Sequence, residues 1–237
     1  MTGDSPAVVL LSGGLDSAVV LAICRTEGFR PCALTIDYGQ RNRLELEGAT
    51  QISDALGAEQ HIVLKIDLTQ WGGSALTGGH EVPTGRAIEE MAHSIPITYV
   101  PARNTIFLSV AMAWAETLGT GHVYIGAHAL DYSGYPDCRP EYFRAFEQMA
   151  NLATRSGVEE NTTWQIHTPL LRMTKQQIVR RGVALAVPFE HTHSCYQPTR
   201  DGLACGVCDA CLLRLAAFAA VGIPDPIHYR QDGTTSS

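Results

Sequence analysis

Short blocks of apolar residues alternate with longer, helix-forming blocks along the chain. Three short blocks predict buried strands, at residues 7–11, 31–39 and 61–66. Four longer blocks predict helices, at residues 18–27, 43–56, 104–118 and 139–155. We expect a fourth strand at residues 122–127 and further helices at residues 175–182 and 212–221. The alternation predicts an α/β fold with a doubly wound, mostly parallel sheet and right-handed crossovers.

One stretch, residues 70–95, does not fit this alternation. It is rich in turn-forming residues: Gly72, Gly73, Gly78, Gly79, Pro83 and Gly85. We expect an insertion over the sheet, with a short polar helix near residues 86–92, that acts as a lid over a ligand. The chain is predicted to divide into a large domain over residues 1–190, a small C-terminal module over residues 191–230 that contains four closely spaced cysteines, and a disordered tail over residues 231–237.

The segment Ser12-Gly13-Gly14-Leu15-Asp16-Ser17 lies between the first predicted strand and the first predicted helix. A glycine-rich turn at the start of a helix leaves backbone N–H groups unpaired, and the helix dipole adds partial positive charge there. The glycines let a ligand approach the main chain, and the two serines add hydroxyl donors. These properties favour phosphate binding. The alternative is an ordinary strand-to-helix turn that Asp16 or Ser17 caps.

The spacing of this segment narrows the kind of phosphate site. The sequence has neither a Gly-x-x-x-x-Gly-Lys-[Ser/Thr] loop nor a Gly-x-Gly-x-x-Gly motif. The segment resembles the pyrophosphate loop (PP-loop) of the N-type ATP pyrophosphatases, whose fold is adenine nucleotide alpha hydrolase-like and Rossmann-like. Those enzymes split ATP between its α- and β-phosphates, adenylate an oxygen and let a nucleophile displace AMP. The resemblance implies an ATP site formed by Leu11, Ser12, Gly13, Gly14, Leu15, Asp16, Ser17, Ala18, Val19, Val20 and Leu21.

Composition and charge argue against several classes of partner. The 237 residues are 45% hydrophobic, as in globular proteins, and no apolar run reaches the roughly 20 residues of a membrane span. The net charge is −7 and the 17 Lys and Arg residues do not cluster, so a small-molecule substrate is favoured over nucleic acid. Because the first residues are not basic, we expect no signal peptide and a cytoplasmic location.

Four of the seven cysteines crowd into 17 residues near the C-terminus. Their spacing, Cys-x9-Cys-x2-Cys-x2-Cys, predicts one structural Zn²⁺ site formed by Cys195, Cys205, Cys208 and Cys211. Alternatives are an iron–sulfur cluster, a catalytic thiol or inert buried cysteines. A ferredoxin-type spacing would place its next cysteine at position 215, which is Leu215. His191 and His193 lie near enough in sequence to replace one cysteine as ligands.

Five further segments narrow the resemblance to one family. They are Asp37-Tyr38-Gly39-Gln40-Arg41, Val100-Pro101-Ala102-Arg103-Asn104, Asp131-Tyr132-Ser133-Gly134-Tyr135-Pro136-Asp137-Cys138-Arg139, Thr192-His193-Ser194-Cys195-Tyr196, and Cys205-Gly206-Val207-Cys208-Asp209-Ala210-Cys211 with Arg214. Together with the PP-loop, they resemble the QueC family of 7-cyano-7-deazaguanine synthases over nearly the whole chain. One departure is His128, since many relatives carry a small or amide residue near it; contact with the nucleobase there would shift substrate preference.

The resemblance implies that ATP activates a carboxylate for attack by ammonia. 7-Carboxy-7-deazaguanine and free ammonia would give the nitrile through an amide, with one ATP for each oxygen lost. It also implies Mg²⁺ with the ATP, and a homodimer. The implied catalytic residues are Ser12, Asp16, Ser17, Arg103 and Lys175. The implied substrate-binding residues are Tyr38, Gln40, Arg41, Asp131, Tyr132, Tyr135, Asp137 and Arg139, with Asp137 facing the base and Arg139 the carboxylate.

Other functions of such a loop stay open on the sequence. One is a related PP-loop enzyme that modifies tRNA, although such enzymes have RNA-binding domains and basic surfaces that this acidic sequence does not show. Another is an enzyme that attaches a deazaguanine to a protein partner. The last is a non-catalytic zinc scaffold, which the intact PP-loop argues against.

Overall fold

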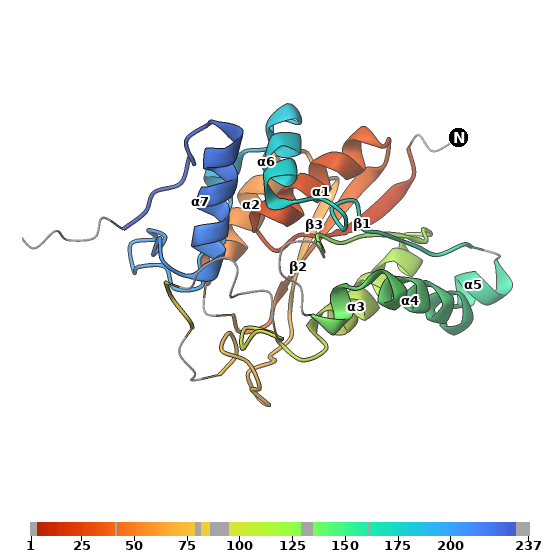
Figure 1. Cartoon of the computed structure of the whole chain (residues 1–237). Coiled ribbons are helices and arrows are strands. Elements are labelled where there is room, and N and C mark those ends of the chain that lie inside the picture. Colours follow the sequence, from red (N-terminus) through yellow and green to blue (C-terminus); the bar gives the residue numbers. More distant parts are fainter. Residues whose placement is uncertain are drawn as a thin grey trace, which may run out of the picture.

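A five-stranded parallel sheet lies at the centre of the chain (Figure 1). The computed structural model describes residues 4–40, 42–78, 82–85, 95–128, 135–160 and 162–230. The strands are β1 (Pro6–Leu10), β2 (Arg30–Asp37), β3 (Gln60–Lys65), β4 (His122–Tyr124) and β5 (Gln165–His167). They lie in the order β3-β2-β1-β4-β5, and Val8 of β1 is paired with Cys32 on one side and Val123 on the other. All neighbouring strands are parallel, so the predicted doubly wound parallel sheet is confirmed.

Helices cover both faces of this sheet (Figure 1). One face carries α1 (Leu15–Thr26), α2 (Leu44–Ala55), α6 (Lys175–Ala184) and α7 (Asp209–Val221). The other carries α3 (Arg103–Thr117), α4 (Pro140–Ala153) and the short α5 (Arg155–Glu159). Successive residues of β1 enter opposite cores: Val8 and Leu10 pack towards α3, and Ala7 and Val9 towards α1. A strand buried on both faces must be apolar throughout, which explains the unbroken apolar run at its position.

Every strand and helix predicted within the described residues is present, with shifted ends. The predicted helix over 139–155 is wrong at its end, because the Thr154 side chain accepts a hydrogen bond from Gly157 N and starts α5 as a separate helix. The first helix begins at Leu15, not residue 18, because Gly14 already has the extended conformation of an N-cap. β5 was not predicted, since Ile166 is its one buried residue and three residues carry little periodicity.

The predicted insertion packs against the rest of the molecule where it is described. Ala75, Leu76 and Val82 are buried in the core on the α3 face. Thr84 forms an isolated antiparallel bridge with Cys208. The predicted helix at residues 86–92 and the predicted tail at 231–237 lie outside the described residues. The lid role and the division of the chain into domain and module stay predictions. No helix in the described parts of the chain is long and apolar enough to cross a membrane.

Candidate active site and metal centre

The PP-loop lies at the topological switch point of the sheet, where the strand order reverses. The chain runs outward from β1 through β2 to β3, and β4 then enters on the opposite side of β1. Ligands of doubly wound sheets bind beyond the carboxyl ends of the strands at such a point. The segment after β4 closes on the loop, because a Cβ added at Gly126 would lie 3.1 Å from Ser17 N. Strand order therefore points to the same place as the motif.

Hydrogen bonds within the PP-loop hold both serine hydroxyls in place. Ser12 N donates to Ser17 Oγ at 3.1 Å, Gly14 N donates to Ser12 Oγ at 3.3 Å, and Ser17 Oγ donates to Gly14 O at 3.0 Å. Gly13 has φ +84°, and a Cβ there would overlap the main-chain oxygen of Glu45, so glycine is required. No side chain in the described part of the chain caps α1. Its first N–H groups are therefore available to an anion.

Asp16, in the first turn of α1, binds a lysine that lies 159 residues later in the sequence. Lys175 Nζ donates to Asp16 Oδ1 at 2.7 Å and to Oδ2 at 2.6 Å, and His128 Nε2 lies 3.6 Å from Oδ2. Burial acts to raise the pKa of Asp16, but the charges of Lys175 and then His128 outweigh it and lower the pKa below its usual value. An ionised carboxylate and an ammonium group thus lie together at the phosphate end of the site. His128 belongs to this end.

A cavity of about 330 Å³ extends from the PP-loop, a size typical of small-ligand sites. Its phosphate end is lined by Ser12, Asp16, Ser17, His128 and Lys175. Its other end, which we call the aromatic end, is lined by Tyr38, Gln40, Arg103, Tyr135 and Tyr196, and Glu45 also lines the cavity. The cavity thus joins the catalytic residues implied by the resemblance to three of the implied substrate residues. Gly14 is also part of its lining, whereas Ala18, Val19, Val20 and Leu21 are buried in the core on the α1 face.

The aromatic end has flat faces and one fixed cation. The ring of Tyr38 lies 5.5 Å from that of Phe107, and Arg103 Cζ lies 5.9 Å from the Tyr38 ring. Tyr135 Oη and Thr98 Oγ1 are 3.1 Å apart. Burial raises the pKa of Tyr38 and of Tyr135, against the opposing charge of Arg103, so both phenols stay protonated. Such a surface suits a planar heterocycle with hydrogen-bonding edges.

Glu45 is a cavity residue that the sequence reasoning missed. It lies in the first turn of α2, and burial raises its pKa to about 8 although the charge of Arg103 acts in the opposite direction. The available signal was a pair of acidic residues at a helix start, Glu45 and Glu47. Acidic residues are common there for electrostatic reasons alone, so the pattern does not tell which of the two faces a ligand.

Two predicted substrate-binding residues lie outside this cavity. Asp137 is 5% exposed and its Oδ2 accepts a hydrogen bond from Asn104 N at 3.0 Å, which ties the segment before α4 to the start of α3. Arg139 is exposed, and its Nε donates to Pro136 O at 3.2 Å. Both residues line a neighbouring open depression. Arg41, Asp131 and Tyr132, which were also predicted to bind substrate, lie outside the described residues.

The four predicted metal ligands come together. Sγ atoms of Cys195, Cys205, Cys208 and Cys211 all lie within 4.8 Å of one another and are buried. The Cys205 and Cys211 sulfurs are 3.9 Å apart. Zn–S bonds of about 2.3 Å in a tetrahedron place sulfurs about 3.8 Å apart, so the set fits one Zn²⁺ ion. Within the described residues, neither His191 nor His193 belongs to this group.

Hydrogen bonds link the four sulfurs to one another and to the main chain. Cys205 N donates to Cys195 Sγ at 3.2 Å, and Cys208 N donates to Cys205 Sγ at 3.3 Å. The thiols of Cys195 and then Cys211 donate to Cys208, which lowers the pKa of Cys208 and raises the pKa of the two donors. Such surrounding donors orient metal ligands and stabilise their charge.

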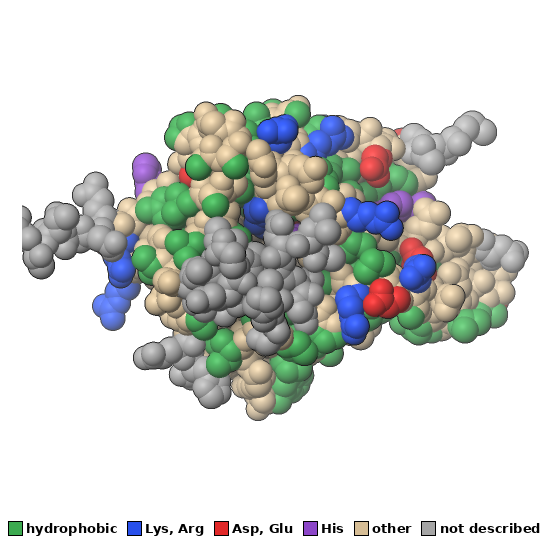
Figure 2. Space-filling view, in the orientation of Figure 1, with side chains coloured by type: hydrophobic (Ala, Val, Ile, Leu, Met, Phe, Trp, Pro, Cys, Tyr) green, Lys and Arg blue, Asp and Glu red, His purple; other side chains and the backbone are tan. Residues whose placement is uncertain are grey.

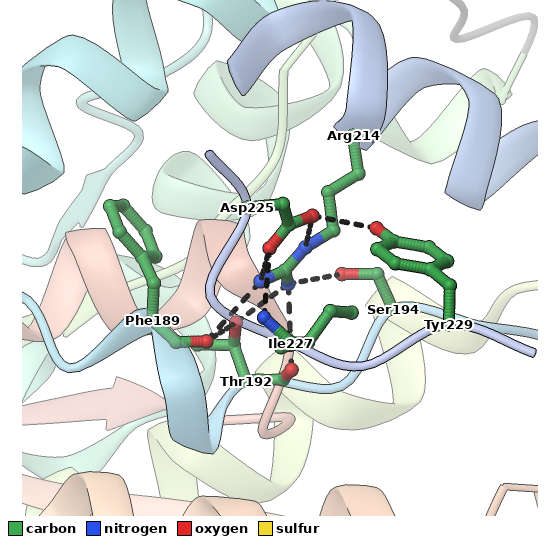
Figure 3. A network of polar contacts seen from close by, with 7 residues as sticks. All are labelled: Phe189, Thr192, Ser194, Arg214, Asp225, Ile227 and Tyr229. Carbon is green, nitrogen blue, oxygen red and sulfur yellow. Dashed lines mark hydrogen bonds and ion pairs between the residues drawn. The ribbon is translucent and has the colours of Figure 1, made fainter. Parts of the chain in front are cut away.

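A buried ion pair holds the segment between α6 and the cysteines (Figure 3). Arg214 Nε donates to Asp225 Oδ2 at 2.7 Å and its Nη2 to Oδ1 at 2.9 Å, with the side chains 1% and 3% exposed. Arg214 Nη1 also donates to Thr192 Oγ1 at 2.6 Å. The next residue, His193, donates its main-chain N–H to Gly13 O at 2.9 Å. The ion pair therefore stabilises the PP-loop through Thr192 and His193.

Known proteins resemble the chain over almost its whole length. The sequence profile of the family described as Queuosine biosynthesis protein QueC matches residues 6–222. The 7-cyano-7-deazaguanine synthase of Desulfatibacillum aliphaticivorans is 60% identical over 94% of this chain and 96% of that protein. The protein of the same name from Solidesulfovibrio magneticus is 56% identical over 97% of this chain and 99% of its own length. Among solved structures, NMN synthetase from Francisella tularensis aligns with a TM-score of 0.48 and 17% identity, over 94% of this chain and 78% of that one.

Proposed function

The chain belongs to the QueC family, and we propose that it converts 7-carboxy-7-deazaguanine and ammonia to 7-cyano-7-deazaguanine with ATP, a step of queuosine precursor synthesis. The observation that carries the proposal is the single cavity that joins the PP-loop to the aromatic end. A nucleotide on the loop and a heterocycle among the tyrosines would meet inside it. ATP-dependent carbon–nitrogen bond formation needs both in contact.

In the first step, a carboxylate oxygen of the substrate attacks the α-phosphorus of ATP, and pyrophosphate leaves. The N–H groups at the start of α1 and the hydroxyls of Ser12 and Ser17 hold the departing pyrophosphate. Lys175 supplies positive charge to the phosphates as the bond breaks. Asp16 is the carboxylate at this end suited to Mg²⁺, which would neutralise phosphate charge.

Ammonia then attacks the adenylated carbon, and AMP leaves to give the amide. The amide oxygen is adenylated by a second ATP, and loss of AMP gives the nitrile. Each oxygen must leave as AMP because hydroxide is a poor leaving group at neutral pH. The chemistry therefore needs the same loop twice and one fixed position for the heterocycle.

At the aromatic end, the rings of Tyr38, Tyr135 and Tyr196 receive the deazaguanine. Arg103, which borders the rings and lines the cavity, binds the carboxylate before activation and the phosphate afterwards. Asp137 holds the start of α3 through Asn104 and so positions Arg103. Arg139 lies in the neighbouring depression, and its predicted role at the carboxylate stays a prediction.

The test is to incubate the purified, zinc-loaded chain with ATP, Mg²⁺, ammonium and 7-carboxy-7-deazaguanine. Mass spectrometry is expected to show the amide first and the nitrile later, with AMP formed in step with each. Asp16→Asn is expected to abolish AMP formation while the far-ultraviolet circular dichroism stays unchanged. The proposal would be contradicted if AMP formed without the amide, or if the zinc-loaded chain formed no AMP.

Parallel incubations separate the other functions of such a loop. Unmodified tRNA in place of the deazaguanine is expected to give no AMP, because the Lys and Arg side chains on the face in Figure 2 are scattered and form no single basic patch. Incubation with the deazaguanine but without ammonium is expected to give no protein adduct. The homodimer and the cytoplasmic location stay predictions.

A further inference from the structure

Glu45 lies between the phosphate end and the aromatic end of the cavity. Its main-chain oxygen packs on the PP-loop, where a Cβ at Gly13 would overlap it. Its side chain lines the cavity. The charge of Arg103 acts to lower the pKa of Glu45, and the charge of Glu45 acts to raise the pKa of Tyr38. A carboxyl group on a heterocycle at the aromatic end must reach the α-phosphate at the loop. The reacting carbon must therefore lie between the two ends of the cavity that Glu45 lines.

The other carboxyl groups of the cavity are engaged elsewhere. Among described residues, the cavity is lined by three carboxyl groups, those of Asp16, Glu45 and Asp209. Both oxygens of Asp16 accept hydrogen bonds from Lys175, which keeps it ionised and unreactive as a base. Asp209 opens α7 directly after the metal ligand Cys208. Glu45 is the carboxyl group placed at the junction of the two ends.

The charges that act on Glu45 leave its carboxyl group able to exchange a proton near neutral pH. Burial raises the pKa of Tyr38, on which the charge of Glu45 acts, so this phenol stays neutral. Arg103 stays positive. Burial raises the pKa of Glu45 to about 8. A general base is most effective when its pKa lies near the working pH.

We propose that Glu45 is the catalytic base that removes the N–H protons of the incoming nitrogen, an inference that rests on the proposed function. When the lone pair of ammonia bonds to the adenylated carbon, the nitrogen becomes positively charged. Unless a proton leaves, the adduct expels ammonia again. The Glu45 carboxylate takes this proton, the carbon–oxygen bond to AMP breaks, and its electron pair departs with AMP.

The same position serves the second half of the reaction. After the amide oxygen has attacked the α-phosphorus, the nitrogen still carries two protons. Their removal supplies the electron pairs for the carbon–nitrogen triple bond while the remaining oxygen leaves with AMP. Glu45 passes each proton to solvent and returns to the carboxylate. One base at the junction therefore accounts for both nitrogen steps.

Glu45→Gln tests the role, with Glu47→Gln as the matched control. Both substitutions remove one carboxylate from the first turn of α2, but Glu47 is exposed and lies outside the cavity lining. Two rates are measured: ATP–pyrophosphate exchange with 7-carboxy-7-deazaguanine and no ammonium, and amide formation at saturating ammonium. Exchange reports activation, which comes before any nitrogen proton is lost. Amide formation reports the proposed step.

For Glu45→Gln we expect exchange to persist and amide formation to fall about 10²- to 10⁴-fold. The rise of kcat with pH near 8 is expected to vanish in Glu45→Gln and to return in part in Glu45→Asp. Glu47→Gln is expected to match the unchanged chain in both assays. An equal fall of exchange and amide formation, or an unchanged rate and pH profile, would overturn the role of Glu45 alone. No amide from the unchanged chain would overturn the proposed function and this inference with it.

Discussion

Replacing Arg214 by methionine would leave the carboxylate of Asp225 buried without its cation. The two side chains are 1% and 3% exposed and share two hydrogen bonds, at 2.7 and 2.9 Å (Figure 3). Methionine keeps most of the length and apolar volume of the arginine stem, so the change removes charge and donors more than packing. The complementary change at the other member of the pair, Asp225→Asn, keeps the shape of the side chain and removes the charge that neutralises Arg214.

The expected loss follows from burial. Breaking a buried ion pair by removing one partner costs about 3–5 kcal/mol, because the remaining charge is left uncompensated. Arg214 also donates to Thr192 Oγ1 at 2.6 Å and to Phe189 O at 3.2 Å, and each lost partner adds about 1 kcal/mol. For a chain of this size, such a loss lowers Tm by on the order of 10 °C. The double variant should cost about 2 kcal/mol less than the sum of the single variants, since the second change removes the orphaned charge.

The assay is urea and thermal unfolding of the zinc-loaded protein at one protein concentration. The control is Arg155→Met, which removes an exposed ion pair with Glu159 at 2.8 Å, with side chains 75% and 63% exposed. This control is expected to cost less than about 0.5 kcal/mol. If Arg214→Met cost no more than the control, or if the two changes at Arg214 and Asp225 were additive, the pair would not hold the segment as argued.

Three further substitutions test separate parts of the structure. Gly13→Ala is expected to abolish ATP binding, because the added Cβ would displace Glu45. The control Gly119→Ala, at φ +70° with no atom within 4 Å of the added Cβ, carries only a backbone cost of about 1 kcal/mol. Equal effects of the two variants in a nucleotide-binding assay would refute the steric overlap between a Cβ at Gly13 and Glu45. Cys208→Ala is expected to lose the metal by elemental analysis and to weaken ATP binding; iron with visible absorbance in the unchanged chain would contradict the zinc site. Burial lowers the pKa of His167 to about 4. The neutral imidazole therefore contributes stability above pH 6.5 that is lost as the pH falls towards 4, on the order of 1 kcal/mol after allowance for its partial exposure. In His167→Phe, the urea midpoint of unfolding is expected to change less with pH over this range.

The features that the sequence predicted well depend on neighbouring residues. The PP-loop needs Ser12 to Ser17 in one turn, and three of the metal ligands lie within the short segment from Cys205 to Cys211, at the start of α7. Strands buried on both faces are apolar at every position, so β1 and β2 were visible as unbroken runs. Such local patterns survive folding because the geometry that they need is supplied by the same short segment.

The features that the sequence did not predict depend on where distant segments meet. Asp137 and Arg139 belong to the most specific family segment, yet the first is taken up by Asn104 and the second lies outside the cavity. Glu45 and Glu47 are equivalent by pattern, and the packing of α2 on the loop decides between them. The pairing of Arg214 with Asp225 likewise joins a helix to the segment that follows it through a turn that no periodicity predicts.

The four-cysteine cluster and the PP-loop are joined by two short paths, so a metal ion in the cluster would affect the loop. Along the first, Cys195 comes two residues after His193, whose N–H donates to Gly13 O at 2.9 Å. Along the second, Asn42 Nδ2 donates to Cys195 O at 3.0 Å while its Oδ1 accepts from Leu44 N at 3.1 Å, at the start of the helix whose second residue packs on the loop. Both supports of the PP-loop therefore start at one residue, Cys195. A tetrahedral ion that held the Cys195 sulfur would therefore also hold the PP-loop, the proposed cradle for pyrophosphate.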